Sequence, residues 1–419
     1  MKVILWIVIP SCMIASFPLK ADEPTEPHTS IRFIEPNDRS GSSIAVSTTN
    51  TALVHTAQIL PKPVTIPLDG IDVLSLQMKS CFQELESTLR EAGTTLSNVV
   101  KLNIYVTADG DGREVESRLS SFLPRGTRPA FSFVTTPLLQ PGARIAFDAV
   151  AVTNQNPSEV RRWRRRGDSD LNSPTQLLTS GQTAGAILPI GPRLYISGQA
   201  EVGDGTLRQA TQRTMESLKR TMIHFGIRPA DVVQLKAFLR PMSDASTAVA
   251  VMEAAFVGSL PPAIVLVEWD SPQAPIEIEL IAASPVQPNS KELPSIEFLT
   301  PPAMKASPVF ARVVRVNHPT TIYLSGLYGT ATDPNGGDEV RDLFGTLKRI
   351  TTENGSDLRH LVKATYYVTT DEVSGHLNTV RPGVYDPERP PAASKAKVRG
   401  TGRAGRTITM DLIAVPAMP

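Results

Sequence analysis

The sequence predicts an α+β fold built from three tandem copies of one unit. A nine-residue segment occurs three times, beginning at Gly93, Gly226 and Gly355, and its glycine always stands eight residues before a lysine or a glutamine. The copies lie 133 and 129 residues apart. A repeat with this period indicates structural units of similar size that stack on one another.

Each copy shows the same order of elements. A short strand comes first, followed by a helix, a strongly apolar strand, a second helix and a closing strand. The repeated glycine falls just past the first helix, where a left-handed cap requires glycine. The ranges are, for the opening strands 53–58, 194–199 and 322–327, for the first helices 74–89, 207–222 and 340–350, for the middle strands 99–106, 232–239 and 361–368, for the second helices 114–122, 245–256 and 372–380, and for the closing strands 145–152, 276–283 and 408–415. We therefore expect two helices on one face of a sheet in each unit.

The repeats are predicted to span residues 30–155, 156–288 and 289–419. Short linkers at 153–158 and 285–294 join them, so the units should pack together. Each closing strand carries an acid at its fourth position, and we expect the three acids to face water or a cleft because an unpaired buried carboxylate is costly. These acids are Asp148, Glu279 and Asp411.

The first 21 residues are predicted to be an export signal that is removed from the protein. Lys2 precedes an apolar stretch, and Ala21 offers a cleavage point. We therefore expect a periplasmic or secreted protein that is not held in a membrane after cleavage; an uncleaved apolar terminus is the alternative. Pro10 disfavours lipoprotein anchoring at Cys12. Without Cys12 no intrachain disulfide is possible, because Cys81 is then the only cysteine, and we expect it to be a buried apolar residue.

Three motifs, in a constant order and in three copies, resemble the Rid/YjgF family of enamine and imine deaminases, also known as the L-PSP endoribonuclease family. They are Ser197-Gly198-Gln199, the segment from Gly226 to Val233, and the segment from Ile276 to Ala282. The resemblance implies tandem chorismate-mutase-like domains, which in the family form a trimer with clefts between subunits. Three copies in one chain then imply a monomeric single-chain pseudo-trimer.

The resemblance also implies the residues of the site. A glutamate positions the attacking water, and an asparagine and a serine line the cleft. The glutamate is present as Glu277 of repeat 2 and the asparagine as Asn378 of repeat 3, which are our candidate catalytic residues. The candidate substrate-binding positions are Thr56, Ser197 and Ser325 for the serine, and Phe131, Ala263 and Ala393 for an arginine that grips the substrate carboxylate.

No repeat keeps that arginine at the aligned position. Each lost charge-assisted hydrogen bond costs roughly 1.5–3 kcal/mol, so an imino acid should bind poorly unless another cation substitutes. The candidate cations are Arg128, Lys395, Arg399, Arg403 and Arg406. The glycine-rich segment from Arg399 to Arg406 is interpreted as a solvated loop, with an anion cradle as the alternative.

By resemblance, the chemistry is hydrolysis of an enamine or imine to a carbonyl compound and ammonia, without cofactor or metal. Because family sites lie between subunits, Glu277 and Asn378 from different repeats are candidates to share one cleft. The alternative function is non-catalytic binding of a small molecule in apolar inter-repeat clefts. A weaker alternative is an endoribonuclease. The net charge of +1 argues against nucleic acid as a partner, and the basic run 161–166 is interpreted as an edge strand of repeat 2, with an RNA-binding patch as the alternative.

Overall fold

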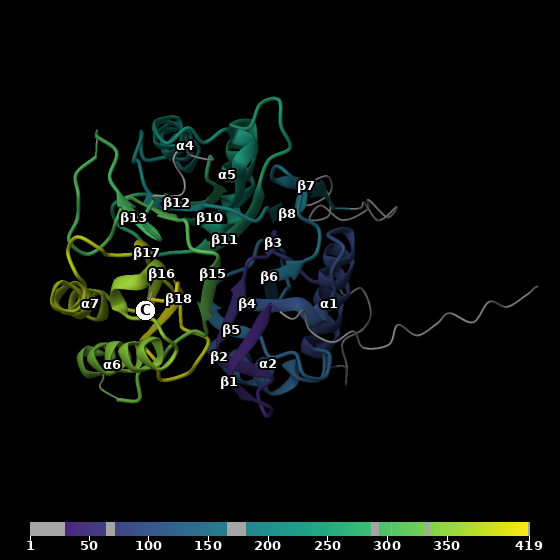
Figure 1. The fold of residues 1–419 in the computed structure, drawn as a ribbon. Coiled ribbons are helices and arrows are strands. Elements are labelled where there is room, and N and C mark those ends of the chain that lie inside the picture. The colour runs from purple at the N-terminus through teal and green to yellow at the C-terminus, as the bar shows by residue number, and fades with distance from the viewer. Residues whose placement is uncertain are drawn as a thin grey trace, which may run out of the picture.

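Three six-stranded sheets surround a common centre and carry their helices on the outside (Figure 1). This computed structural model describes residues 30–63, 72–165, 182–285, 293–302, 304–331, 333 and 335–417. The predicted α+β class with tandem domains is confirmed. The predicted signal at 1–21, with Cys12, lies outside the described residues. Among the helices of the described ranges, none combines the length and apolarity that a membrane span requires.

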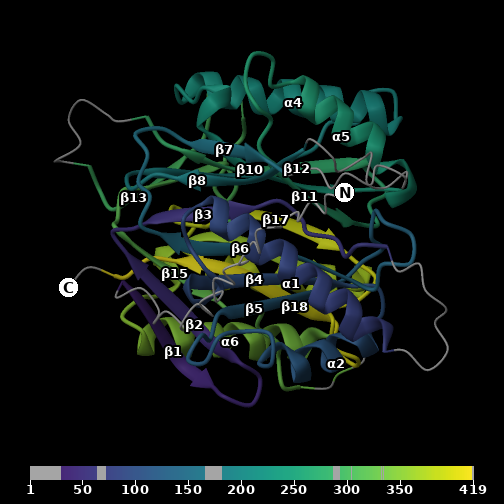
Figure 2. The same ribbon diagram turned by 90° about the vertical axis from the view of Figure 1, so that its right-hand side faces the viewer.

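Four strands and two helices of each unit come from one repeat. Seen from the side, α1 and α2 cover the outer face of the first sheet (Figure 2). The bounds are, for repeat 1, β3 (Ala52–Thr56), α1 (Val73–Glu91), β4 (Val99–Val106), α2 (Asp109–Leu119), β5 (Ala130–Thr135) and β6 (Ile145–Thr153); for repeat 2, β9 (Arg193–Gln199), α4 (Leu207–His224), β10 (Val232–Leu239), α5 (Ala245–Ala254), β11 (Ala263–Glu268) and β12 (Ile276–Ala283); and for repeat 3, β15 (Thr320–Leu324), α6 (Gly337–Glu353), β16 (Leu361–Val368), α7 (Asp371–Val384), β17 (Ala392–Lys397) and β18 (Ile408–Ala414).

The predicted elements form for the expected local reasons. Gly93, Gly226 and Gly355 follow the first helices with φ of 66°, 68° and 68°, so the predicted left-handed caps are confirmed. Cys81 is buried inside the core of the first unit, as expected for an apolar residue. Helix α2 begins at Asp109, earlier than the apolar pattern indicated, and acids in its first turn suit the positive end of the helix dipole.

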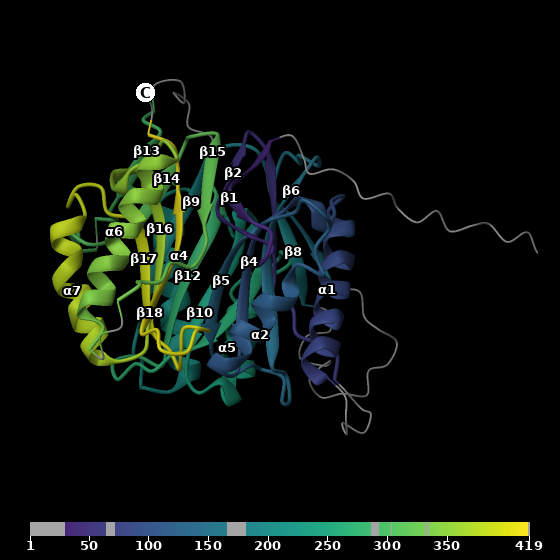
Figure 3. The same ribbon diagram turned by 90° about the horizontal axis from the view of Figure 1, so that it is seen from below.

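The last two strands of each sheet are contributed by a different repeat. The hairpins are β1 (Ile31–Asn37) with β2 (Ser42–Thr49), β7 (Arg161–Arg164) with β8 (Thr183–Leu188), and β13 (Ile296–Leu299) with β14 (Val313–Val316). Strand β2 pairs with β15, β8 pairs with β3, and β14 pairs with β9. The opening hairpin of every repeat therefore completes the sheet of another, which links the three units in a closed ring (Figure 3).

This exchange corrects the assignment of the basic run 161–166. Its described part contains the edge strand β7, but that strand belongs to the sheet of repeat 1 rather than repeat 2. The connection 154–160 is short, so the hairpin stays beside the sheet that the chain has just left. Arg162 donates to the main-chain oxygen of Val232 over 2.9 Å, and Trp163 packs against the core of the first unit. These contacts hold both side chains against the protein.

The three acids of the closing strands were expected to face water or a cleft, but they lie largely buried around a small central cavity. They lie at the centre, where the inner faces of all three sheets meet around a cavity of about 30 Å³. Asp411 pairs with Lys101 of repeat 1 at 2.8 Å, and Glu279 pairs with Lys363 of repeat 3 at 2.7 Å. Asp148 accepts a hydrogen bond from Asn103 over 2.9 Å. Partners from neighbouring strands and repeats thus offset part of the cost of burial, although burial still raises the pKa of Asp148.

Candidate functional site

Each repeat meets the next along a seam, which we name by the two repeats it joins. At seam 2–3, the Ser197 hydroxyl donates to the Ala311 oxygen over 2.5 Å and accepts from the Ala393 amide over 2.7 Å. At seam 3–1, the Ser325 hydroxyl in the same way accepts from the Phe131 amide over 2.9 Å. At seam 1–2, Thr56 instead accepts from Ala149 of its own repeat over 2.9 Å. Two of the three candidate hydroxyls therefore fasten neighbouring repeats together.

Strand register corrects one of the arginine positions. Phe131 stands one residue after the partner of Lys101 on β4, and Ala393 one residue after the partner of Lys363 on β16. In repeat 2 the partner of the equivalent Gln234 is Ala263 itself, so the matching position is Ile264. The assignment of Ala263 was wrong by one residue. It aligned Pro261 of repeat 2 with the proline that stands two residues before the position in the other repeats, whereas the strand pairing aligns Pro262 with it. The corrected position is still apolar.

Seam 2–3 places Glu277 of β12 directly beside Gly198 of β9. A Cβ atom on Gly198 would lie 1.9 Å from the Glu277 Oε1 atom, so the absence of a side chain at residue 198 makes room for the carboxyl group. Burial raises the pKa of Glu277 to about 7; Glu279 acts in the same direction, whereas Ser394 and Lys395 lower the pKa. At neutral pH this side chain is therefore divided between its acid and its carboxylate forms.

Repeat 3 contributes the other side of this seam. Lys395 on β17 donates from Nζ to the Ser374 hydroxyl over 2.7 Å and to Asn378 Oδ1 over 3.1 Å, both on α7. Arg381, one turn further along α7, donates to the same Oδ1 atom over 2.7 Å. Lys395 also lowers the pKa of Glu277 through its charge. The candidate catalytic pair, Glu277 and Asn378, therefore lies at one seam with Lys395 associated with both.

The remaining candidate cations lie elsewhere and are paired with acids. Arg128 bonds to Asp38 over 2.7 Å, Arg399 to Glu268 over 2.9 Å and Arg403 to Glu116 over 2.8 Å, while Arg406 stands 4.0 Å from Glu339. The glycine-rich loop rests on repeat 1 through a bond from the Gly402 amide to Asp109 over 3.2 Å. The segment from Arg399 to Arg406, whose alternative interpretation was an anion cradle, therefore packs against repeat 1, and its three arginines lie beside acids.

Arg381 is a neighbour of Asn378 and Lys395 that the sequence analysis did not single out. It stands three residues after Asn378, so both project from the same face of α7. The guanidinium is buried and lies 5.1 Å from the centre of the Tyr366 ring, an arrangement that favours the cation. The three-residue spacing from Asn378 could have pointed to Arg381, because both lie on one face of α7. The spacing alone does not show what that face packs against.

The other two seams carry different residues at the matching positions. Glu277 is replaced by Ala146 at seam 1–2 and by Thr409 at seam 3–1, as the pairing with the neighbouring strand shows. Lys395 is replaced there by Leu266 and Phe133. All four replacements are buried. The acid of repeat 2 and the amine of repeat 3, which interact electrostatically at seam 2–3, are therefore missing from the matching positions of the other two seams.

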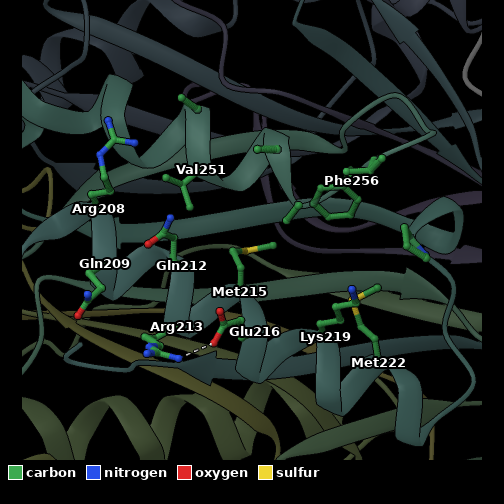
Figure 4. A pocket seen from close by; sticks show the side chains of 15 residues that line it. Arg208, Gln209, Gln212, Arg213, Met215, Glu216, Lys219, Met222, Val251 and Phe256 are labelled. Carbon is green, nitrogen blue, oxygen red and sulfur yellow. Dashed lines mark hydrogen bonds and ion pairs between the residues drawn. The ribbon is translucent and has the colours of Figure 1, made fainter. Parts of the chain in front are cut away.

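A separate groove lies on the outer surface of repeat 2 (Figure 4). It has a volume of about 710 Å³ and runs between α4 and α5, over the apolar side chains of Met215, Met222 and Phe256. Arg213 on its edge is paired with Glu216 at 3.1 Å. Because one repeat forms it, this groove differs from the inter-repeat clefts of the binding hypothesis. Within the described ranges, no cluster of three or more His, Cys, Asp or Glu side chains is suited to a metal ion.

Comparison with known proteins supports the sequence resemblance. The model of the family "Endoribonuclease L-PSP" matches residues 43–153 and 176–284, slightly more than half of the chain. The chain belongs to the L-PSP family. Each matched segment contains the four strands and two helices that one repeat contributes to its unit, and residues 293–417 of this L-PSP family chain repeat the same order of elements.

Individual relatives are distant. A RutC family protein of Synechocystis sp. is 29% identical over 103 residues, which cover 25% of this chain and 79% of the relative. A YjgF family member from Neisseria meningitidis is 22% identical, with 30% of this chain and 97% of that chain covered and a TM-score of 0.23. RidA from a Psychrobacter species is 22% identical, with 22% and 79% covered and a TM-score of 0.21.

Proposed function

We propose that this L-PSP family chain hydrolyses imines, or the enamines that tautomerise to them, at seam 2–3. The observation that carries the proposal is that Glu277 of repeat 2, whose pKa burial raises to about 7, is close enough to Lys395 of repeat 3 for the lysine charge to lower that pKa, while Lys395 itself bonds to Asn378. We also propose that the protein is exported, because Lys2, the apolar stretch after it and Ala21 have the pattern of a signal sequence.

The reaction needs a group that moves protons in both directions. Water adds to the carbon of the C=N bond, a proton passes from that water to the nitrogen, and ammonia leaves while the carbonyl forms. A carboxyl group that ionises near the working pH accepts a proton in the first step and returns one in the second. Glu277 meets this requirement, since its two forms coexist near neutrality. Asn378 offers an amide beside the same seam.

Positive charge from α7 and β17 takes the place of the family arginine. Lys395 stands two residues after the aligned arginine position, and Arg381 approaches from the helix above the same strand. Together they favour a substrate with a carboxylate next to the C=N carbon, because charge-assisted hydrogen bonds are stronger than neutral ones. The proposed substrates are therefore 2-imino acids, with one functional seam in each chain.

The test is a deamination assay with imines formed in place by an amino-acid oxidase. The chain should remove a 2-imino acid faster than buffer does, and faster than an imine that lacks the carboxylate. Lys395→Met should lower kcat/KM for the 2-imino acid by about 10–100-fold, since one charge-assisted hydrogen bond contributes about 1.5–3 kcal/mol.

The matched control is Lys397→Met, two residues along the same strand, which should leave the rate unchanged. Lys397 is paired with the exposed acids Asp270 and Asp371. If neither kind of imine reacts above the buffer rate, the enzymatic function is excluded and the binding function replaces it.

A further inference from the structure

Lys395 differs from its neighbouring lysines in the partners of its amine. Lys101, Lys363 and Lys397 each hold a carboxylate within 2.7–3.0 Å. The Nζ atom of Lys395 instead bonds to two neutral oxygens, those of Ser374 and Asn378. An ion pair stabilises the ammonium form of lysine, whereas neutral acceptors do so much less.

The two acceptors of Lys395 are also compatible with the neutral amine. A neutral lysine has two N–H groups and one lone pair, whereas an ammonium group has three N–H groups and no lone pair. Ser374 Oγ and Asn378 Oδ1 can accept both N–H groups of the neutral form. The lone pair then remains available to attack an electrophilic carbon.

The electrostatic surroundings act in the same direction. Burial lowers the pKa of Lys395 below its ordinary value and the neighbouring Arg381 guanidinium lowers it further, while Glu277 and Asp371 oppose them. The guanidinium group of arginine is a permanent cation in proteins. The seam therefore retains a cation for a substrate carboxylate when Lys395 has lost its proton.

We propose that Lys395 is a nucleophile that forms a Schiff base with the substrate carbon at seam 2–3. The neutral amine adds to the C=N carbon of the imine, and the original nitrogen takes up the two protons that Nζ gives up and leaves as ammonia, so that a C=N bond to Nζ remains. Water then adds to that carbon, and the bond to Nζ breaks to release the carbonyl compound and restore the amine. Both steps balance without an oxidant or a reductant.

Glu277 supplies the proton transfers that these two steps need. Its carboxyl group lies against Gly198, across the seam from β17, and can donate to a departing nitrogen and accept from the attacking water. A partly buried lysine whose pKa is lowered suits nucleophilic amine catalysis, and the Glu277 carboxyl group supplies the proton transfers. This inference rests on the proposed function for its choice of substrate.

Reductive trapping tests the inference directly. The full chain is incubated with 2-oxobutyrate and borohydride, and the adducts are located by peptide mass mapping. We expect one reduced adduct on Lys395, formed faster than any adduct on an exposed lysine such as Lys348. Lys395→Arg keeps a positive charge but cannot form a Schiff base, so it should lose both the adduct and most of the deamination rate, whereas Lys348→Arg should retain both.

Two results would overturn the inference. One is trapping that spreads over surface lysines at equal rates, and the other is full deamination by a folded Lys395→Arg protein. A different result would show that the proposed function fails while the inference holds. In that case the adduct forms on Lys395, but the chain hydrolyses no imine. The wild-type mass map does not depend on how well any variant folds.

Discussion

Replacing Glu277 by glutamine is expected to lower kcat/KM for 2-imino acid hydrolysis by about 10²–10⁴-fold, the range contributed by a positioned acid–base group. Glutamine has nearly the same shape and still fits beside Gly198, so the fold should be preserved. It cannot accept the proton of the attacking water or return it to the leaving nitrogen. The measurement is the initial deamination rate at several substrate concentrations.

The pH dependence identifies the same group. Because burial raises the pKa of Glu277 to about 7, the side chain is mostly protonated below pH 7 and cannot act as a base. We therefore expect kcat/KM to rise with pH through about 7 and to level off above it. The rise should vanish in Glu277→Gln. If kcat/KM of Glu277→Gln still rose with pH through about 7, the pH dependence would belong to another group.

Thr409→Val provides the matched control for this prediction. Thr409 occupies the position equivalent to Glu277 at seam 3–1, where it is buried and faces no lysine of β5. The substitution conserves shape and removes one hydroxyl group. If catalysis is confined to seam 2–3, this variant should deaminate as the wild type does; a comparable loss of activity in both variants would indicate a structural cause.

Replacing Lys101 by methionine is expected to lower the free energy of unfolding by about 3–5 kcal/mol, the usual cost of leaving a buried partner charge unpaired. Lys101 is 3% exposed and its partner Asp411 is 12% exposed. Burial alone raises the pKa of Asp411, but Lys101, Lys236 and Lys363 outweigh it and hold the pKa at about 2. Urea unfolding at neutral pH measures the loss, because Asp411 is ionised there.

Two further variants separate the buried charge from other effects. Lys397→Met breaks contacts with carboxylates that are 64% and 81% exposed, so its cost should be within about 1 kcal/mol. The double variant Lys101→Met with Asp411→Leu removes both charges and should recover part of the lost stability. Equal losses for Lys101→Met and Lys397→Met would show that the centre is not a desolvated charge network.

Local pattern was sufficient to predict most of the elements. The middle strands at 232–239 and 361–368 and the closing strand at 276–283 have the predicted bounds, because apolar residues and flanking glycines define a strand locally. The exchange of hairpins was not predicted. A strand sequence specifies which face is buried but not which of two edges it joins, and β8 lies beside β3 rather than within its own repeat.

The site was predictable only where it follows the family pattern. Ser197, Glu277 and Ala393 were chosen from the family pattern and lie where repeats 2 and 3 meet, whereas their roles, and that of Asn378, stay predictions. Arg381 was missed because its proximity to Lys395 depends on how α7 packs on β17. That packing cannot be read from the sequence. The central acids were placed wrongly for a similar reason, since Lys101 and Lys363 reach them from other repeats.

The number of small molecules bound by one chain tests the central idea of a single functional seam most directly. Native mass spectrometry with 2-oxobutyrate, the carbonyl product of a 2-imino acid, should show a monomeric chain carrying one molecule, and Lys395→Met should abolish that binding while Thr409→Val preserves it. Three molecules per chain, or one molecule that Lys395→Met leaves in place, would contradict the account.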